Sequence, residues 1–339
     1  MSNPADLPQI TRRRALAAAA FACAPAALGG SSAVQALAQG PSFGIPRTAA
    51  MRTLGGRVLL PDGRCLGYAD FGYESGPLVL YFHGVPGSRL EGALIADDAL
   101  ACGVRVVSID RPGLGLSTFH SGRRVLDWPA DAMHVAHALG YRTGVIGILG
   151  LSGGAPYALA CIRCVPERVG HVGIVSGHTP MNVPGAGRGS QDRFIEFITR
   201  RPRLAKIAIG LIIRRLHRNP SAVLSRVARE LAASDRRLLL DDSVNRAGFL
   251  ANLQAATSQG PWPVINAVNL LARDWGFRLD DLPPSSISIW QGACDPIAPS
   301  AMGHYFHQHL AGSELYVDPK AGHVTMLKWH AREILSRFV

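Results

Sequence analysis

The sequence predicts an α/β fold in which helices cover both faces of a mostly parallel sheet. Short apolar runs of strand length recur along the chain and alternate with segments of helical spacing. These runs are continuously apolar, which is typical of strands that are buried on both faces of a sheet. Glycine and polar residues follow several of the runs directly. Because ligands bind at the carboxyl ends of such strands, we expect a functional site there.

The composition is that of a globular protein with a large core. The chain has 339 residues, of which 47% are hydrophobic and 17% charged, so it can bury a core without disulfides. Its formal net charge is +11, but the arginines are scattered, and no strand carries the interleaved aromatic residues that bind RNA or single strands. We expect no nucleic-acid partner, and at most a weak attraction to an anionic envelope surface.

Residues 1–38 have the pattern of a twin-arginine signal peptide. Three arginines at positions 12–14 precede an apolar stretch over residues 15–28, and a small-x-small pattern ends at Ala38. The stretch is too short for a membrane span, and a lipoprotein acylated at Cys23 fits less well. We expect cleavage after Ala38 and therefore a periplasmic or secreted protein. Cleavage removes three arginines and one aspartate, which lowers the formal net charge to +9.

The first elements follow a linker over residues 39–52. Residues 57–72 predict a hairpin, because Pro-Asp-Gly lies between two apolar runs. Continuous apolar runs predict strands over residues 77–82, 104–110, 144–150 and 171–177. Helical spacing predicts helices over residues 127–140 and 155–164, and the first of these begins with an aspartate and ends with a glycine. Together these elements build the first half of an α/β core over residues 53–180.

The alternation stops between residues 181 and 280. This region is rich in arginine and has helical spacing over residues 204–218, 221–240 and 267–277. We interpret it as a helical cap whose apolar face packs over a pocket, and contact with a membrane is the alternative. Within this region, Trp262 and Trp275 can either line an acyl pocket or belong to the core.

The second half of the core covers residues 281–339. A strand is predicted over residues 285–292, a helix after Pro299, a strand over residues 313–318 and a final helix that ends at Val339. An aspartate follows the first of these strands, and a histidine follows the second.

Ser152 is the candidate nucleophile. Gly150-Leu151-Ser152-Gly153-Gly154 fits the G-x-S-x-G pattern and lies where a predicted strand gives way to a predicted helix. A sharp turn at this place brings main-chain groups close together, so its neighbours must be small. The same pattern also occurs by chance, and an ordinary turn or helix cap is the alternative.

Asp295 and His323 complete a candidate catalytic triad. Asp295 follows the strand over residues 285–292, and His323 follows the strand over residues 313–318. A serine hydroxyl is a poor nucleophile until an imidazole accepts its proton, and the imidazole needs a carboxylate to hold its tautomer. The chain order Ser152, Asp295, His323 is the order of nucleophile, acid and base that this mechanism has in α/β proteins.

The oxyanion of the tetrahedral intermediate requires two preorganised backbone donors. The amide of Gly153, directly after the nucleophile, is the first. The second comes from the loop "HGVPGSR" after the strand over residues 77–82. Pro86 has no N–H group, so we favour Val85, with Gly84 as the alternative. His83 is interpreted as a residue that braces this loop.

Several segments together resemble the α/β-hydrolase superfamily, and specifically its capped serine-hydrolase branch. The segments are "HGVPGSR" (83–89), "DRPGLGLS" (110–117), "DWPADAMHVAHALG" (127–140), "GLSGGAPYALA" (150–160), "WQGACDPIAP" (290–299) and "AGHVTML" (321–327). The resemblance covers roughly residues 53–339. It implies an eight-stranded, mostly parallel sheet flanked by helices, a helical cap inserted after the sixth strand, and a cis peptide bond between Val85 and Pro86.

No metal or cofactor is expected. Two groups of histidines, His134 with His137 and His304 with His307 and His309, lack a nearby carboxylate. Five cysteines remain after the predicted cleavage, and an odd number does not describe a disulfide framework. Three of them, Cys161, Cys164 and Cys294, are expected to be small packing residues.

The sequence therefore predicts an exported serine hydrolase that cleaves a carboxylic ester of a small or medium apolar acyl group. The same triad can also cleave amides or peptides, hydrolyse carbon–carbon bonds, or carry out perhydrolysis without a cofactor. A non-catalytic binding protein of the same fold is the alternative from another class. Epoxide hydrolases and haloalkane dehalogenases of this superfamily have an aspartate where this chain has Ser152, which argues against those reactions.

Overall fold

The computed structural model describes residues 48–181 and 183–339. The signal peptide predicted over residues 1–38 and the linker up to residue 47 lie outside the described residues. Within the described ranges, no helix is long and apolar enough to cross a membrane.

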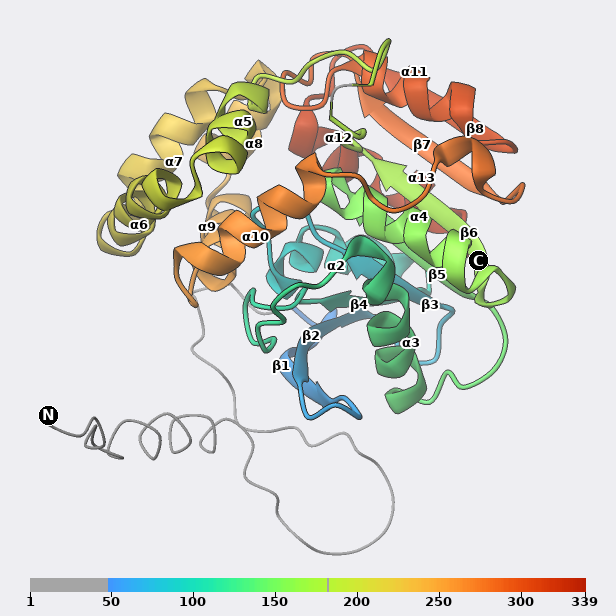
Figure 1. The fold of residues 1–339 in the computed structure, drawn as a ribbon. Coiled ribbons are helices and arrows are strands. Elements are labelled where there is room, and N and C mark those ends of the chain that lie inside the picture. The colour runs from blue at the N-terminus through green and yellow to red at the C-terminus, as the bar shows by residue number, and fades with distance from the viewer. Residues whose placement is uncertain (1–47, 182) are drawn as a thin grey trace, which may run out of the picture. The chain divides into compact units, whose positions relative to one another are not determined.

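One eight-stranded sheet organises the fold, as the sequence predicts (Figure 1). Its strands are β1 (Met51–Leu59), β2 (Cys65–Gly72), β3 (Leu78–Phe82), β4 (Arg105–Ile109), β5 (Ile146–Leu151), β6 (Val169–Val175), β7 (Ile287–Gly292) and β8 (Ser313–Asp318), in the spatial order β1-β2-β4-β3-β5-β6-β7-β8. The pairs β1–β2 and β2–β4 are antiparallel, and all other neighbours are parallel. The predicted hairpin is confirmed, and Gly63 in its turn has a φ of +84°.

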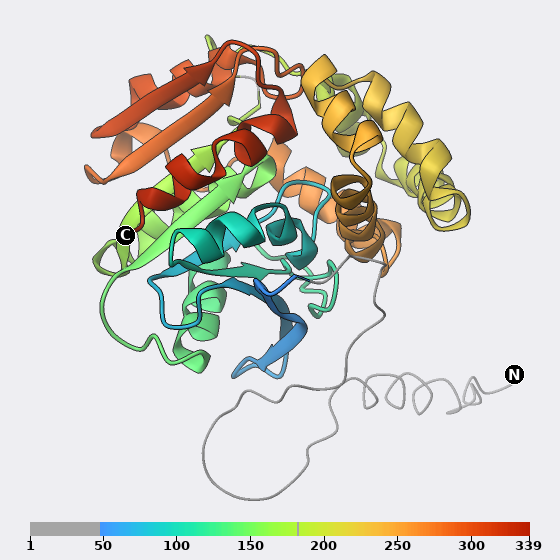
Figure 2. The same ribbon diagram turned by 180° about the vertical axis from the view of Figure 1, so that it is seen from behind.

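Helices cover both faces of the sheet (Figure 2). The core helices are α2 (Ala96–Ala101), α3 (Trp128–Ala138), α4 (Ala155–Cys164), α11 (Ser300–His309), α12 (His323–Trp329) and α13 (Ala331–Ser336), with short 3-10 turns η1 (Arg89–Ile95), η2 (Val125–Asp127), η3 (Ser152–Gly154), η4 (Pro166–Arg168) and η5 (Leu279–Asp281). Along β3, Leu80 packs with α3 and α4, whereas Val79 packs with α2 and α13. Successive side chains of a strand point to opposite faces, so the sheet separates two apolar layers.

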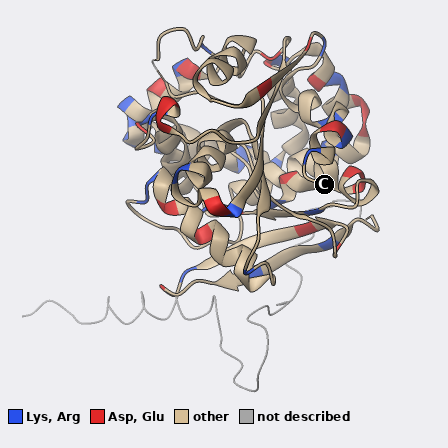
Figure 3. Ribbon diagram, turned by 90° about the vertical axis from the view of Figure 1, so that its right-hand side faces the viewer, with Lys and Arg blue, Asp and Glu red and all other residues tan. Residues whose placement is uncertain are grey.

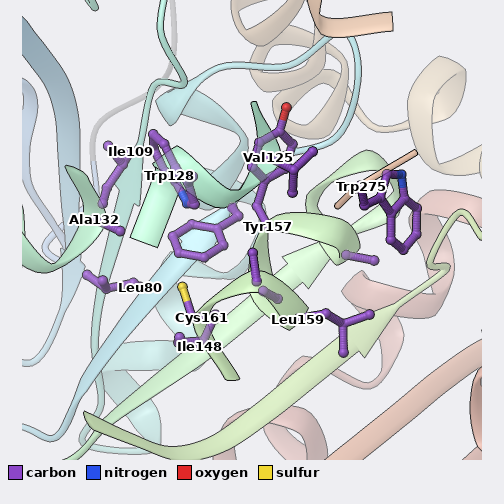
Figure 4. Packing of buried hydrophobic residues seen from close by; sticks show 14 of the residues in the cluster. Leu80, Ile109, Val125, Trp128, Ala132, Ile148, Tyr157, Leu159, Cys161 and Trp275 are labelled. Carbon is purple, nitrogen blue, oxygen red and sulfur yellow. The ribbon is translucent and has the colours of Figure 1, made fainter. Parts of the chain in front are cut away.

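Aromatic residues anchor the larger of these layers (Figure 4). The ring of Trp128 lies edge-on to Phe82 and to Tyr157, with centroid distances of 5.3 and 6.0 Å. Such edge-to-face pairs add to the stabilisation that comes from burying apolar area. They hold α3 and α4 firmly under the carboxyl ends of β3 and β5, where the candidate site lies.

Within the described residues, six helices lie between β6 and β7, in the region expected to form the cap (Figure 1): α5 (Asp192–Arg200), α6 (Pro202–Arg218), α7 (Pro220–Arg229), α8 (Ala233–Asp241), α9 (Ser243–Ala256) and α10 (Pro261–Ala272). The segment 221–240, expected as one helical stretch, divides into α7 and α8. Leu231 in the break and Asp235 in the first turn of α8 are both buried.

Two expectations about cysteines were wrong. Cys164 and Cys294 are exposed, while Cys161 is buried in the core as predicted. Helix α4 ends at Cys164, which therefore no longer shares the buried face of that helix. Neither tryptophan of the cap lines the candidate pocket. Trp275 is buried in the core, whereas Trp262 is exposed and lies beside Lys206.

Candidate active site

Ser152 occupies a strained turn at the end of β5. Its φ of +52° lies in the left-handed region, which side chains other than glycine rarely adopt. A Cβ on Gly154 would lie 2.0 Å from the carbonyl oxygen of Phe82, so the neighbouring glycine is required for the close passage of β3. The turn places Ser152 at the wall of a cavity. This arrangement agrees with the strand-to-helix context that the G-x-S-x-G pattern requires.

His323 and Asp295 are brought together from the ends of β8 and β7. The Nδ1 atom of His323 lies 2.7 Å from Oδ2 of Asp295, and both side chains are buried. The other carboxylate oxygen of Asp295 accepts the amide N–H groups of Ile297 at 2.8 Å and Ala298 at 3.0 Å. Because a carboxylate accepts, this contact leaves the proton on Nδ1 and the lone pair of Nε2 free.

Opposing effects act on the pKa of His323. Burial disfavours the charged imidazolium, but the charge and hydrogen bond of Asp295, with the charges of Asp235 and Glu91, favour it more strongly. The pKa of His323 is therefore raised above its ordinary value of 6.5. A base with this pKa can take a proton near neutral pH.

Ser152 and His323 line the same cavity, of about 270 Å³. The loop after β3 forms one side of it with Gly84, Val85 and Pro86. The cap supplies a largely apolar wall, which includes Ile212 and Leu216 of α6, Val223 and Val227 of α7, and Phe249 and Leu253 of α9. The cavity therefore combines a few polar groups with an apolar lining, as small-molecule sites usually do.

The loop after β3 approaches the turn after β5 closely. A Cβ on Gly153 would lie 2.7 Å from Cγ2 of Val85 and 3.5 Å from its amide nitrogen. The peptide bond between Val85 and Pro86 is cis, as the resemblance implies. No hydrogen bond within the described residues uses the Val85 N–H group. Val85 and Gly153 are thus neighbours beside Ser152.

Glu91, which no sequence pattern singles out, lines the cavity and braces this loop. Its Oε2 atom accepts the amide N–H of Gly84 at 2.7 Å and the hydroxyl of Tyr81 at 3.1 Å, and Oε1 accepts from Asn252 of α9 at 3.2 Å. Burial raises the pKa of Glu91, and these hydrogen bonds partly oppose that rise. The amide of Gly84 is therefore already engaged.

Arg111 and His83 stabilise the loop after β3 by further hydrogen bonds. The guanidinium of Arg111 donates to the carbonyl oxygens of His83 and Gly84, the latter at 2.7 Å, and its own amide donates to Nε2 of His83 at 3.2 Å. Burial, and secondarily the charge of Arg111, keeps the pKa of His83 well below its ordinary value. His83 is thus a neutral acceptor, in line with its interpretation as a bracing residue.

The histidines of the two groups contact other residues, and His309 lies 2.7 Å from a carboxylate oxygen of Asp280. Within residues 48–181 and 183–339, no cluster of three or more histidine, cysteine, aspartate or glutamate side chains could hold a metal ion. His134 contacts the carbonyl oxygen of Leu59, and His137 contacts Arg168.

The chain resembles several proteins of known fold over most of its length. An esterase from Exiguobacterium antarcticum superposes with a TM-score of 0.62, at 18% identity over 83% of this chain and 97% of that one. A bromoperoxidase from Bacillus anthracis superposes with a TM-score of 0.60, at 20% identity over 81% of this chain and 95% of that one. At these identities the likeness supports the fold.

One curated relative aligns in sequence over part of the chain. A non-heme chloroperoxidase from Streptomyces lividans is 33% identical over 136 residues, which are 38% of this chain and 46% of that protein. The alignment thus spans about half the length of the relative. A sequence profile described as "Alpha/beta hydrolase family" matches residues 79–333. This match covers the sheet from β3 to β8, the cap and the whole candidate site, and the chain therefore belongs to the alpha/beta hydrolase family.

Proposed function

We propose that the protein hydrolyses carboxylic esters through an acyl-enzyme with Ser152 as the nucleophile. Nε2 of His323 accepts the hydroxyl proton while Oγ of Ser152 attacks the carbonyl carbon, and His323 then gives that proton to the departing alcohol. Asp295 holds the imidazole in the required tautomer and stabilises its charged form. Water, with His323 again as base, releases the acid and restores Ser152.

The amides of Val85 and Gly153 are the proposed oxyanion donors. Of the two amides considered, that of Gly84 donates to Glu91, whereas the N–H group of Val85 takes part in no hydrogen bond of the described residues. Two preorganised N–H groups aimed at the developing oxyanion stabilise the transition state more than the substrate.

The observation that carries the proposal is the single cavity shared by Ser152, His323 and the apolar wall of the cap. Ligand pockets commonly enclose about 300–1,000 Å³, and this cavity, at about 270 Å³, lies near the lower limit. A small or medium apolar acyl group fits these dimensions. Amides, peptides and carbon–carbon bonds require the same nucleophile and remain alternatives to esters.

Covalent labelling with a fluorophosphonate probe tests the nucleophile. We expect labelling of the wild-type protein at Ser152, found by peptide mapping, and its loss in Ser152→Ala and His323→Ala. A folded wild-type protein that does not react would contradict the proposal and favour a non-catalytic binding protein. A panel of matched esters, anilides and β-diketones then separates ester, amide and carbon–carbon hydrolysis by their values of kcat/KM.

Perhydrolysis is the second candidate, because the relative from Streptomyces lividans is a non-heme chloroperoxidase. In this reaction hydrogen peroxide replaces water as the group that attacks the acyl-enzyme, so a carboxylic acid and hydrogen peroxide give a peracid and water. The proposed triad is sufficient for it without a redox cofactor. Peracid formation from acetate and hydrogen peroxide, lost in Ser152→Ala, would support this candidate.

Export through a twin-arginine signal belongs to the same proposal. The supporting observations are the arginines at positions 12–14 and the small-x-small pattern before residue 39. Expression of the full chain, cell fractionation and N-terminal sequencing test it. We expect a product that begins at Gln39 outside the cytoplasm, and retention of the precursor when Arg12 and Arg13 are both replaced by lysine.

A weak attraction to an anionic lipid surface is supported by helix α6. Leu204, Ile207 and Leu211 lie three and four residues apart on this helix and are 52%, 64% and 62% exposed. Its basic residues, Arg203, Lys206, Arg214, Arg215 and Arg218, take part in none of the described ion pairs, and α6 has no acidic residue. In the view of Figure 3, basic and acidic residues are interspersed. Apolar and cationic groups on one helix favour binding in the plane of an anionic interface.

Sedimentation with vesicles tests this attraction. We expect the protein to sediment with vesicles that contain phosphatidylglycerol but not with pure phosphatidylcholine, and to be released by salt. Replacing Arg214 and Arg215 by glutamine should weaken binding roughly 30-fold, at about 1 kcal/mol for each charge. The control removes the same charge at the exposed Arg142 and Arg163 and should change binding little. Equal weakening in both variants would contradict a role for α6.

A further inference from the structure

Asp235, a residue of the cap region, binds the N-terminal amides of helix α12, which begins with His323. Asp235 lies in the first turn of α8 and is fully buried. Its Oδ2 atom accepts the amide N–H of His323 at 2.7 Å. Its Oδ1 atom accepts the amide N–H groups of Val324 at 3.0 Å and Thr325 at 2.8 Å, and the hydroxyl of Thr325 at 2.7 Å. One side chain therefore binds three successive amides of α12.

The first amides of a helix have no partner within the helix, and a nearby side chain usually satisfies them. Here the residue before α12 is Gly322, which has no side chain to do so. A Cβ at this position would lie 2.3 Å from Oδ2 of Asp235 and 2.6 Å from Cβ of Ala232. The absence of a side chain at Gly322 thus leaves room for the carboxylate of Asp235 to contact the first amides of α12.

The main chain of His323 is held on its other side as well. Its carbonyl oxygen accepts the hydroxyl of Ser176, which follows β6, at 3.0 Å. Its imidazole contacts Asp295 at 2.7 Å. The position of His323 is therefore defined by three polar contacts, of which only the one with Asp235 comes from the cap.

We propose that Asp235 is a positioning residue for His323, through which the cap sets the place and the charge of the catalytic base. This inference rests on the proposed function. Asp235 fixes the backbone from which the imidazole projects, and its negative charge favours the imidazolium that forms when Ser152 loses its proton. The charged groups that face His323 are Asp295 after β7, Asp235 on α8 and Glu91 on η1. Of these, Asp295 makes the direct contact, so Asp235 acts as a second, more distant carboxylate.

The variant Asp235→Asn tests the inference, because it keeps the size of the side chain but removes its charge and one acceptor oxygen. We expect kcat for an ester to fall on the order of ten- to a hundred-fold with little change in KM, since the base is displaced while the apolar pocket is intact. The acidic limb of the pH profile of kcat/KM should move to lower pH, because the loss of a negative charge lowers the pKa of His323.

Asp242→Asn is the matched control. Asp242 caps α9 by accepting the amide N–H groups of Val244 at 2.8 Å and Asn245 at 3.0 Å, and it lies in the same cap only seven residues away. We expect this control to lower the melting temperature without moving the pH profile. If Asp235→Asn behaves in the same way, Asp235 is a structural helix cap and the inference is wrong.

A second measurement separates this inference from the proposed function. Titration of His323 by NMR, in protein labelled with ¹⁵N-histidine, needs no turnover. We expect a lower pKa in Asp235→Asn than in the wild type, even if no ester substrate is found. An unchanged pKa and an unchanged rate of fluorophosphonate labelling would overturn the inference. If Asp235→Asn does not fold, Asp235→Glu keeps the charge at a shifted position and should retain the pKa of His323 while lowering kcat; a wild-type kcat would also overturn the inference.

Discussion

The carboxylate of Glu91 accepts the amide N–H of Gly84 at 2.7 Å. Gly84 and Val85 were the two alternatives for the second oxyanion donor beside Gly153, and this contact engages the amide of Gly84. It also ties the loop after β3 to η1 and, through Asn252, to the cap. The charge of Glu91 acts on His323 as well, so one partly buried carboxylate influences both sides of the proposed catalytic centre.

The pH dependence of activity should have its acidic limb above pH 6.5. His323 must be neutral to accept a proton from Ser152, and its pKa is raised above 6.5. Activity therefore rises as the pH rises through this pKa and falls below it. Measuring kcat/KM from about pH 5 to about pH 9 checks the prediction. A limb well below pH 6.5 would mean that another group limits the reaction.

Replacing Asp295 by asparagine should lower kcat about 10⁴-fold, because the amide no longer holds the Nδ1–H tautomer or stabilises the imidazolium. The oxygen of the new side-chain amide can still accept the N–H groups of Ile297 and Ala298, so we expect the fold to persist. Steady-state kinetics with circular dichroism measures both effects. A variant that is folded and retains most of its activity would exclude Asp295 as the acid of the triad.

Replacing Gly153 by alanine should lower kcat on the order of 10²- to 10³-fold by disturbing the oxyanion donors. The new Cβ would lie 2.7 Å from Cγ2 of Val85, so the side chain of Val85, or the loop after β3 that carries it, must shift. Gly210→Ala is the control, because nothing lies within 4 Å of a Cβ there and α6 should gain about 0.5–1 kcal/mol. Equal activity of the two variants would argue against this oxyanion hole.

Replacing Asn252 by alanine should reduce both stability and activity. Asn252 accepts the amide of Ser88 at 2.7 Å and donates to Glu91, and it is buried. The Ser88 amide and the Glu91 carboxylate would lose a hydrogen-bond partner, which should lower the free energy of unfolding by about 2–3 kcal/mol. The control is Asn245→Ala on the same helix, which removes an exposed contact with Asp242. Urea unfolding and ester hydrolysis compare the two, and similar losses in both would show that Asn252 has no special role.

Replacing Val227 by phenylalanine should shift the preference of the enzyme to shorter acyl chains. Val227 lines the cavity from α7, so the added ring takes up space that a longer chain would fill. Comparing kcat/KM over p-nitrophenyl esters of increasing acyl length measures the shift. Val145→Phe, at a position that is 66% exposed, controls for the added hydrophobic ring. An unchanged chain-length profile would place the acyl group elsewhere.

Local sequence patterns were enough to predict the sheet. They also predict a helical region between its two halves and single out the strand-end residues of the candidate site. Each of these depends on a pattern within a short window: a continuous apolar run, a helical spacing, or a glycine-bounded serine. The order of the elements then brings Ser152, Asp295 and His323 to the same edge of the sheet, because parallel strands all end there.

The distant residues that support that site became visible only in the folded chain. Asp235 binds the amide of a residue 88 positions away, and Asn252 contacts Glu91 from 161 positions away. Neither has a local signature, since an aspartate in a first helical turn and an asparagine inside a helix are ordinary surface residues by pattern. Their roles arise because the cap packs over the carboxyl ends of the strands, where burial leaves amides and carboxylates no water to bind and makes them partners.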